Sequence, residues 1–197
     1  MLVIDWERFV AGRTIMEDSR PLAITVGVFD GLHLGHLALI RRVLAEAGCI
    51  PTVVTFKENP ARTLTPETFP GDIFGHERKM SLLADLGIEL AVPIDFSGRF
   101  GMMEGRDFID LLLGGSRTKL LVLGEDFRCG HRPGIGSDEI AVLAGRKGVE
   151  TWVSPPVLDG GLPISSSRIR RALAEGRVEE AERLLGRRLE TNVGGKT

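Results

Sequence analysis

The chain has 197 residues, enough for one compact domain with a sizeable core but few for two. Apolar residues make up 43% and charged residues 26%, and the mean hydropathy is +0.07, an ordinary balance for a globular protein. The formal net charge of -2 gives no reason to expect a nucleic acid or an anionic membrane as a partner.

The sequence contains two cysteines, Cys49 and Cys129, which form neither a CxxC pair nor a Cys/His cluster. A disulfide framework or a structural zinc site is therefore not expected. No apolar run approaches the ~20 residues that a membrane-spanning helix needs. The opening stretch MLVIDWERFVAGR has early acidic residues and does not have the layout of a signal peptide. We therefore expect a cytoplasmic protein.

The first clear unit of secondary structure runs from residue 22 to residue 56. Residues 22–29 (LAITVGVF) are apolar and β-branched, which predicts a strand buried on both faces. Residues 36–48 place apolar side chains at helical spacing and predict a helix that ends at Gly48. Residues 49–56 (CIPTVVTF) predict a second strand. This order is typical of a parallel strand–helix–strand unit.

The alternation of helices and strands continues towards the C-terminus. Further helices are predicted over 76–87, 104–114, 137–148, 165–176 and 178–186, and further strands over 88–94, 119–124 and 149–157. Ser137 or Asp138 is the expected N-cap of the helix over 137–148. Five strands in this pattern predict an α/β protein with a doubly wound, mainly parallel five-stranded sheet of the Rossmann type. In such sheets, ligands bind at the carboxyl ends of the strands.

Two segments are too long to be simple connections. Residues 57–75 (KENPARTLTPETFPGDIFG) and residues 124–136 (GEDFRCGHRPGIG) each follow a predicted strand. Loops longer than about 12–15 residues in compact domains are usually functional or disordered. Because both loops begin at strand ends, we expect both at the carboxyl edge of the sheet.

The stretch GVFDGLHLGH, residues 27–36, joins the first strand to the first helix. A helix N-terminus offers free N–H groups to an anion, and Gly35 leaves room for a ligand against the backbone. His33 and His36 lie on one side of the first turn, so both can donate to one phosphate. The stretch is neither a GxGxxG fingerprint nor a Walker A loop. Two other interpretations remain open: a helix cap with a surface histidine, and a metal pair completed by Asp30.

The stretch ISSSRIR, residues 164–170, precedes an apolar helix. Its three serines offer an N-cap and further hydroxyl groups, and Arg168 and Arg170 are expected to point their guanidinium groups near the same helix start. Serine hydroxyls, a helix N-terminus and arginine together can hold a polyphosphate. An ordinary capped helix with solvated arginines is the alternative interpretation.

Three other reactive side chains have simpler interpretations. His131 lies in the glycine-rich loop 124–136 and is expected to be a loop histidine, although such a loop with its arginines can close over phosphates. His76, at a predicted helix start, is expected to be structural. Cys129 has no apparent base partner and is expected to be an inert thiol.

Several of these segments together resemble one protein family. GVFDGLHLGH resembles the HxGH signature of the nucleotidylyltransferase superfamily, and ISSSRIR resembles its second phosphate-binding motif. FDG before the histidines, TFKENP after the second strand, GEDFRCGHRPG and ALAEGRVEEAERLLGR resemble the adenylyltransferase module of prokaryotic FAD synthetases. The resemblance covers residues from about 20 to 188.

The resemblance implies an enzyme that makes FAD and pyrophosphate from FMN and ATP with Mg²⁺, by direct in-line adenylyl transfer. It implies that His33, His36 and Arg170 are catalytic. The implied ATP-binding residues are Gly27, Phe29, Asp30, Gly35, Ser166 and Ser167. The implied FMN-binding residues are Asn59, Asp126, Phe127 and Arg128. No metal ligand from the protein is assigned.

The sequence departs from the family pattern in the segment after the second strand. Where the family usually has TFxPHP, this chain has Glu58 and Asn59 in place of the first proline and the histidine. We expect a single domain over residues 1–186 and a tail over 187–197 without the riboflavin kinase domain of many bacterial relatives. A separate riboflavin kinase is then a possible source of FMN. Ser167 replaces the usual threonine and keeps the hydroxyl.

Two other functions stay open at this point. One is another nucleotidylyltransferase, which acts on phosphopantetheine, nicotinamide mononucleotide or a phosphorylated alcohol. The other is a flavin- or nucleotide-binding module without catalysis, for which the altered KENP segment is the best support.

Overall fold

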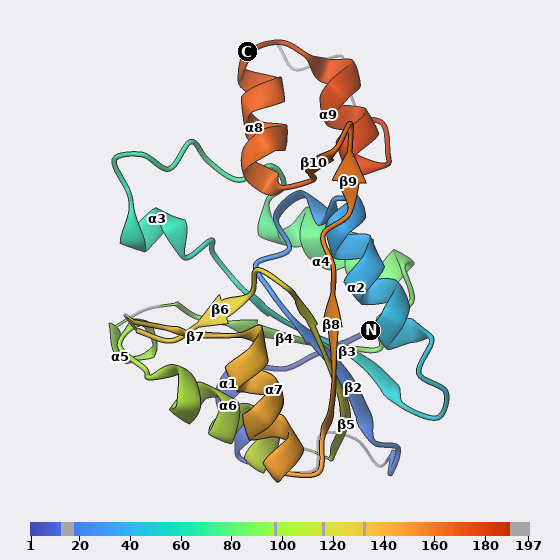
Figure 1. The fold of residues 1–197 in the computed structure, drawn as a ribbon, viewed down its shortest axis with the longest axis vertical. Helices are drawn as coiled ribbons and strands as arrows, with labels where there is room; N and C mark the ends of the chain where they lie inside the picture. Colours follow the sequence, from blue (N-terminus) through green and yellow to red (C-terminus); the bar gives the residue numbers. More distant parts are fainter. Residues whose placement is uncertain (13–17, 97, 116, 132, 190–197) are drawn as a thin grey trace.

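A six-stranded parallel sheet forms the centre of the protein (Figure 1). The computed structural model describes residues 1–12, 18–96, 98–115, 117–131 and 133–189. In spatial order the strands are β1 (Leu2–Val3), β4 (Leu90–Ile94), β3 (Ile50–Phe56), β2 (Leu22–Val26), β5 (Thr118–Gly124) and β8 (Glu150–Ser154). Every neighbouring pair is parallel. The doubly wound α/β fold expected from the sequence is thus confirmed.

The sheet has one strand more than the five expected. The extra strand is β1, in which Leu2 pairs with Leu90 and Val3 with Ala91 at the edge of the sheet. Its two residues are exposed and too few to show a period of two, so the hydrophobic pattern did not reveal it. The helix α1 (Trp6–Val10), which follows β1, was not predicted either.

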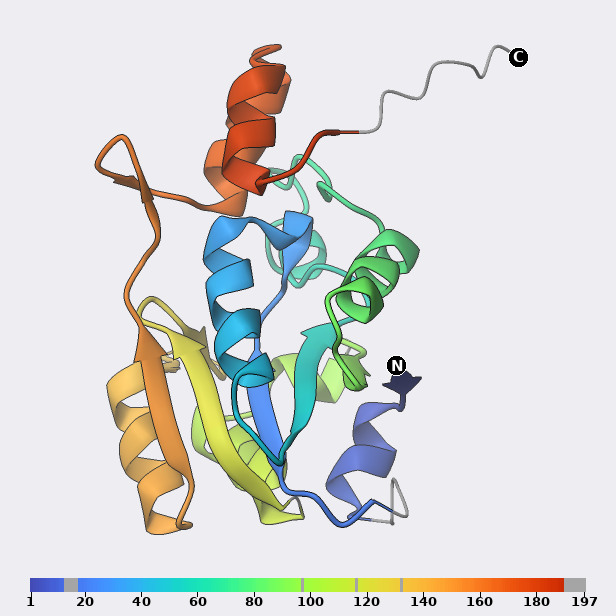
Figure 2. The same cartoon turned by 90° about the vertical axis from the view of Figure 1, so that its right-hand side faces the viewer.

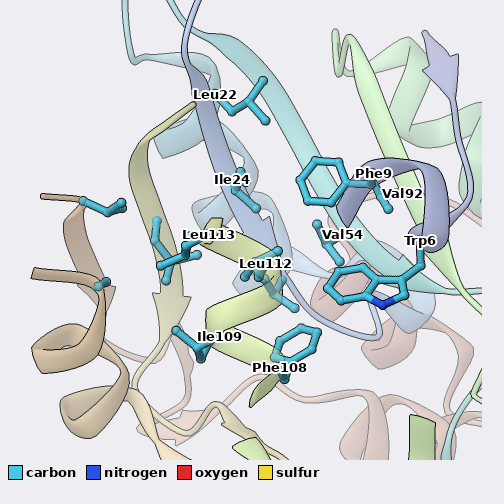
Figure 3. Packing of buried hydrophobic residues seen from close by; sticks show 14 of the residues in the cluster. Trp6, Phe9, Leu22, Ile24, Val54, Val92, Phe108, Ile109, Leu112 and Leu113 are labelled. Atoms are coloured by element: carbon cyan, nitrogen blue, oxygen red, sulfur yellow. The ribbon is translucent and has the colours of Figure 1, made fainter. Parts of the chain in front are cut away.

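Helices cover both faces of the sheet. On one face, α1, α6 (Gly105–Gly114) and α7 (Ser137–Arg146) pack against the sheet, and Figure 3 shows this core with its aromatic residues. On the other face lie α2 (Leu34–Leu44) and α4 (His76–Asp85). Ile24 faces the first cluster and its neighbour Ala23 the second. Because both faces are apolar, the strand sequence reads as a continuous hydrophobic run.

The chain changes direction across the sheet at β2. From β2 it crosses through α2 to β3, and later it returns to β5 on the other side of β2. The carboxyl ends of β2 and β5 therefore flank the topological switch point, where ligands bind in open α/β sheets. Residues 27–33 leave β2 at this point.

Several predicted boundaries differ from the structure: for example, β2 ends at Val26 rather than at residue 29, and α2 begins at Leu34 rather than at residue 36. The helix α2 ends at Leu44 rather than at Gly48, because Ala45 caps it and Gly48, with φ of +74°, belongs to the turn before β3. The N-cap of α7 is Gly136, since Ser137 is already helical and its hydroxyl donates to the Glu125 carbonyl at 3.1 Å.

The C-terminal part of the described chain stands beyond the carboxyl end of the sheet (Figures 1 and 2). It consists of the hairpin β9 (Leu158–Asp159) and β10 (Leu162–Pro163) and the helices α8 (Ser166–Ala174) and α9 (Val178–Leu185). Gly160 and Gly161 both have positive φ, which suits a two-residue hairpin turn. The two helices form a third apolar cluster, against which Leu34 of α2 packs.

The two long loops carry small elements of their own. Residues 57–75 include the short helix α3 (Ala61–Leu64), and residues 124–136 form the hairpin β6 (Arg128–Cys129) and β7 (Ile135–Gly136). The short helix α5 (Gly98–Gly101) precedes α6. Figure 1 shows α3 and the β6–β7 hairpin projecting on the same side of the molecule. No helix in the described ranges is long and apolar enough to cross a membrane.

Candidate functional site

The loop that leaves β2 has an unusual backbone. Phe29, Gly31 and Leu32 have φ of 54°, 79° and 44°, in the left-handed region that residues with a side chain rarely adopt. Both Phe29 and Leu32 are fully buried, so packing holds the loop in this conformation. Strained backbone of this kind gathers at functional sites. This left-handed corner, residues 29–32, directly precedes His33 at the start of α2.

His33 and His36 form one stacked pair at the start of α2. His33 is the N-cap, and its Nδ1 accepts a hydrogen bond from the His36 backbone N–H at 3.3 Å. The two ring centroids are 3.6 Å apart and the rings are inclined by 17°. Because Nδ1 of His33 is an acceptor, the proton of its neutral ring is on Nε2, which is then a donor. Phe29 packs edge-on against His36, with centroids 5.1 Å apart.

Both imidazoles are held in the neutral form. Burial, together with the nearby Arg187, lowers the pKa of His33 to about 4. Burial lowers the pKa of His36 well below its usual value, and the charges of His33, Lys79 and Arg187 add to this effect. The buried Nδ1 of His36 has no hydrogen-bond partner among the described residues. A ligand anion at this place would favour protonation of the pair.

The start of α8 lies against the start of α2. Ser166 Oγ donates to the Asp30 carbonyl at 2.9 Å. A Cβ on Gly35 would come within 3.1 Å of the His33 ring and 3.6 Å of the Ile164 carbonyl oxygen, so only glycine leaves this narrow gap open. The two motifs, far apart in the sequence, therefore meet at one place.

Both helix starts keep N–H groups outside their helical hydrogen bonds. In α2 the first such bond runs from Leu37 N to His33 O, and in α8 from Ile169 N to Ser165 O. The N–H groups of the residues before these donors are the ones that bind anions at helix N-termini. Ser165 is the N-cap of α8, and its hydroxyl accepts from Arg168 N at 3.2 Å.

Asp30, which is buried, forms an ion pair with the half-buried Arg170. Asp30 Oδ2 pairs with Arg170 Nη2, and Asp30 Oδ1 accepts from the backbone N–H groups of Ile73 at 2.8 Å and Phe74 at 3.3 Å. Arg170 Nε donates to the Gly71 carbonyl at 2.9 Å. This pair thereby anchors the end of the long loop 57–75 over the site.

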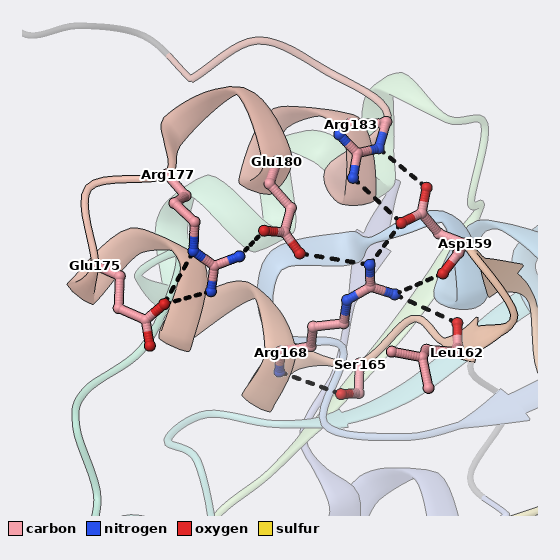
Figure 4. A network of polar contacts seen from close by, with 8 residues as sticks. All are labelled: Asp159, Leu162, Ser165, Arg168, Glu175, Arg177, Glu180 and Arg183. Atoms are coloured by element: carbon pink, nitrogen blue, oxygen red, sulfur yellow. Dashed lines mark hydrogen bonds and ion pairs between the residues drawn. The ribbon is translucent and has the colours of Figure 1, made fainter.

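Arg168 does not point towards the histidines, and the expectation that it lies beside Arg170 is wrong. Its Nη2 pairs with Asp159 at 2.6 Å and Glu180 at 3.4 Å, as Figure 4 shows. Arg183 also pairs with Asp159, at 3.0 Å. This network joins the β9–β10 hairpin to α8 and α9. Successive residues on a helix point about 100° apart, which is why Arg168 and Arg170 serve different places.

Arg187 is a site residue that the sequence did not reveal. Its Nη1 donates to the Gly31 carbonyl at 3.1 Å and its Nη2 to the Leu32 carbonyl at 2.8 Å. It therefore holds the left-handed corner directly before His33. It comes from the first residue of the expected tail over 187–197, of which residues 190–197 lie outside the described residues. Nothing in its local pattern distinguishes it from a surface arginine.

Lys79 is the second such residue. It is only 6% exposed, and its ammonium group lies at the carboxyl ends of β2 and β3. Burial lowers its pKa to about 8. It shares the buried face of α4 with Leu83 four residues later. A lysine at a position that helical periodicity assigns to the core was the signal that could have identified it.

A small pocket with a cavity volume of about 10 Å³ lies beside the Asp30–Arg170 pair. Val28, Asp30, Lys57, Asn59, Asp72, Phe74, His76 and Lys79 line it. Asn59, 8% exposed, accepts a hydrogen bond from Ala61 N at 3.1 Å and so holds the start of α3. His76 is the first residue of α4, at the helix start expected for it, and burial lowers its pKa.

The remaining predicted residues lie where β5 ends. The backbone N–H of Phe127 donates to the Gly124 carbonyl at 3.0 Å, and its ring packs against the core below. Arg128 donates to the Gly134 carbonyl within the β6–β7 hairpin. Asp126 and Arg128 are exposed, whereas burial raises the pKa of the Cys129 thiol to about 12. Arg132 of this loop lies outside the described residues.

The site offers few ligands for a metal ion. In the described part of the chain, no three His, Cys, Asp or Glu side chains gather into a possible metal site. The nearest carboxylate, Asp30, uses both oxygens for Arg170, Ile73 and Phe74. The metal pair of histidines with Asp30 is therefore not the arrangement present, and these residues do not form a magnesium ligand set.

A doubly wound sheet whose switch point carries an HxGH helix start, facing a second helix start, has the architecture of a nucleotidylyltransferase. The family model described as FAD synthetase matches residues 15–168. The chain belongs to this family.

Curated relatives agree with this assignment. The bifunctional riboflavin kinase/FMN adenylyltransferase of Escherichia coli strain K12 is 32% identical over 171 residues, which cover 83% of this chain and 53% of that protein. The protein of the same name from Bacillus subtilis is 32% identical over 181 residues, which cover 87% of this chain and 55% of that protein. The chain thus spans about half the length of these relatives.

Solved structures share the fold. A crystal structure titled as a macrolide-efflux protein from Streptococcus pneumoniae superposes with a TM-score of 0.80 at 26% identity, over 95% of this chain and 62% of that one. A pantoate–β-alanine ligase from Francisella tularensis superposes with a TM-score of 0.57 at 16% identity, over 94% of this chain and 85% of that one, which shows a common fold only.

Proposed function

We propose that this chain transfers the adenylyl group of ATP to FMN, forming FAD and pyrophosphate by direct in-line attack. The observation that carries the proposal is the stacked pair of neutral histidines at the N-terminus of α2, 3.6 Å apart and facing the start of α8. Family membership supports the reaction, and the names of the curated relatives supply the acceptor, FMN.

His33 and His36 would stabilise the negative charge that develops on the transferring α-phosphate. The Nε2 of His33 is the donor of its ring, because Nδ1 is occupied by the His36 N–H. The attacking oxygen of FMN belongs to an anionic phosphate, so the reaction needs no general base. Positioning and charge neutralisation then supply most of the acceleration.

The backbone around the histidines would form the ATP cradle. Gly35 leaves the narrow gap between the two helix starts, while Gly27 and Phe29 shape the cradle from beneath, since the Phe29 ring is fully buried. Ser166 and Ser167 at the start of α8 would present N–H groups to the β- and γ-phosphates. The Ser166 hydroxyl already donates to Asp30 O and is less available.

Arg170 would reach the same phosphates from the side. Its Nε and Nη2 are engaged with Gly71 and Asp30, and Nη1 has no partner in the described part of the chain. Asp30 would act by orienting Arg170 and the loop rather than by touching ATP. Because the site forms no magnesium ligand set, Mg²⁺ is proposed only as a companion of the ATP phosphates, and no step is routed through it.

FMN would lie over the segment 57–75, against the mouth of the small pocket beside the ion pair, because the cavity itself has room for only about one water molecule. Asn59 lines that pocket, and Asp126, Phe127 and Arg128 lie at the end of the neighbouring β5. We further propose that residues 1–186 form the catalytic domain, whose histidine loop is supported by Arg187 directly after it. We also propose that the protein works in the cytoplasm without nucleic acid or membrane, and that a riboflavin kinase supplies FMN.

The test is direct. Pure, folded protein is incubated with ATP, Mg²⁺ and FMN, and FAD and pyrophosphate are measured. FAD formed in step with pyrophosphate supports the proposal. Pyrophosphate released with phosphopantetheine or nicotinamide mononucleotide, but not with FMN, identifies a different acceptor. Tight flavin binding without any turnover identifies a binding module instead.

A further inference from the structure

The ammonium group of Lys79 joins two strand ends. Its Nζ donates to the Phe56 carbonyl at 2.7 Å, to the Val28 carbonyl at 3.2 Å and to the Thr55 hydroxyl at 3.3 Å. The Thr55 hydroxyl in turn donates to the Val28 carbonyl at 3.1 Å. All three N–H groups of the Lys79 ammonium therefore donate hydrogen bonds, two to backbone carbonyls and one to a hydroxyl, at the ends of β2 and β3.

The two carbonyls belong to different loops of the site. Val28 comes directly before the strained corner that leads to His33. Phe56 is the last residue of β3 and comes directly before Lys57 and Asn59 of the pocket. Because β2 and β3 are neighbours in the sheet, a single side chain from α4 spans the junction of the two loops.

The contacts of Lys79 depend on its charge. A neutral amine keeps only two N–H donors, so one of the three acceptors would lose its partner. Burial lowers the pKa of Lys79 to about 8, while the carboxylates of Asp30 and Asp72 act in the opposite direction. Three further titratable groups face Lys79: the rings of His36 and His76, and Lys57. The charge of Lys79 lowers the pKa of both histidines.

We propose that Lys79 is a positioning residue, which fixes the histidine loop 27–33 relative to the segment 57–60 and so sets the separation of the two substrates. This inference rests on the proposed function for its kinetic consequence. Small displacements of reacting groups are costly, since an error of about 1 Å can lower the rate about 100-fold.

The central experiment compares Lys79→Met with Lys147→Met, a lysine at the end of α7 that pairs with Asp110. For Lys79→Met we expect kcat to fall about 100-fold, with a much smaller change in KM for ATP, because the start of α8, which would hold the β- and γ-phosphates, lies outside this junction. Lys147→Met should behave like the wild type. Equal loss in both variants, or unchanged kcat in Lys79→Met, overturns the proposal.

The pH profile separates positioning from a merely structural role. In the wild type and in Lys147→Met, kcat should decline as the pH rises through about 8, because Lys79 then loses its charge. Lys79→Met should lack this alkaline decline. An identical decline in all three proteins overturns the proposal.

Two measurements keep the inference testable if Lys79→Met folds poorly or if the acceptor is not FMN. Thr55→Val removes the hydroxyl of the same junction and should lower kcat in the same direction, by less. Hydrogen exchange needs no substrate: Lys79→Met or Thr55→Val should speed exchange at Gly27 N and Lys57 N, which now bond to Val54 and Ile94. If the wild type forms no FAD, the proposed function is wrong. If exchange at these two amides is unchanged in the variants, the positioning role of Lys79 is wrong, whatever the reaction.

Discussion

The ring of His33 lies parallel to the ring of His36, and the N–H of His36 donates to the first ring. Each histidine thereby fixes the other: His33 caps the helix that carries His36, and His36 covers one face of His33. His33 is buried and His36 half-buried, and burial lowers the pKa of both, so the pair is neutral before any ligand arrives. Preorganised donors of this kind need little rearrangement when charge develops on a reacting group.

His36→Ala should lower kcat about 10²–10³-fold, the usual effect of removing one donor that acts on the transition state. The loss of stability should be small, because the buried Nδ1 of His36 has no partner to lose. Pyrophosphate release and the midpoint of urea unfolding measure the two effects. His131→Ala, an exposed loop histidine, is the control. Equal turnover in His36→Ala and wild type would remove this assignment.

The buried histidines should make the protein less stable in mild acid. His33 has a pKa of about 4 in the folded protein and about 6.5 when unfolded, so between these values the unfolded chain binds more protons. Its stabilising contribution is therefore complete above pH 6.5 and is lost as the pH falls towards 4, at up to about 1.4 kcal/mol per pH unit.

Urea unfolding at several pH values between 7.5 and 4 measures this slope. His33→Gln should make the slope shallower and leave the part that His36 contributes, whose pKa burial also lowers, whereas His131→Gln should leave the slope unchanged. If His33→Gln keeps the full pH dependence, then another group causes it.

Much of the fold could be read from the sequence because its strands are buried on both faces. A continuous apolar run such as residues 22–26 has few alternatives to a central parallel strand, and the histidine loop follows it directly. The strand β1 was not predicted, because two exposed residues are too few to show a hydrophobic periodicity.

The contacts that complete the site depend on tertiary structure. Arg187 bonds to carbonyls 156 and 155 residues earlier in the chain, and Arg170 bonds to Asp30 across 140 residues. Local sequence patterns cannot predict contacts between residues so far apart in the chain. Arg187 was missed because its acceptors are backbone carbonyls, which the sequence does not distinguish, whereas Lys79 could have been identified from its core position in the helical pattern of α4.

Asn59→His should change the interaction with FMN more than the interaction with ATP. Asn59 lines the pocket and holds the start of α3, but makes no contact with the histidine pair among the described residues. KM for FMN and for ATP, measured separately, test this. Asn59→Asp, which keeps the oxygen that accepts from Ala61 N, is the control for helix capping. A response in ATP alone would show that this segment is misplaced in our proposal.

Arg187 supports the histidine loop from directly after the proposed catalytic domain. Arg187→Met should destabilise the protein by about 1–3 kcal/mol, because the carbonyls of Gly31 and Leu32 lose a charged donor. It should also lower kcat, since those carbonyls shape the corner before His33. The exposed neighbour Arg188→Met is the matched control and should change neither quantity.

Shortened chains test the same contact without a substitution. A chain that ends at Gly186 lacks Arg187 and should resemble Arg187→Met in its urea midpoint and its kcat. A chain that ends at Leu189 keeps Arg187, and it also keeps the Leu189 N–H, which donates to Glu182 at 2.8 Å, so it should match the full chain. If the chain that ends at Gly186 is as stable and as active as the longer one, then Arg187 contributes nothing to the histidine loop.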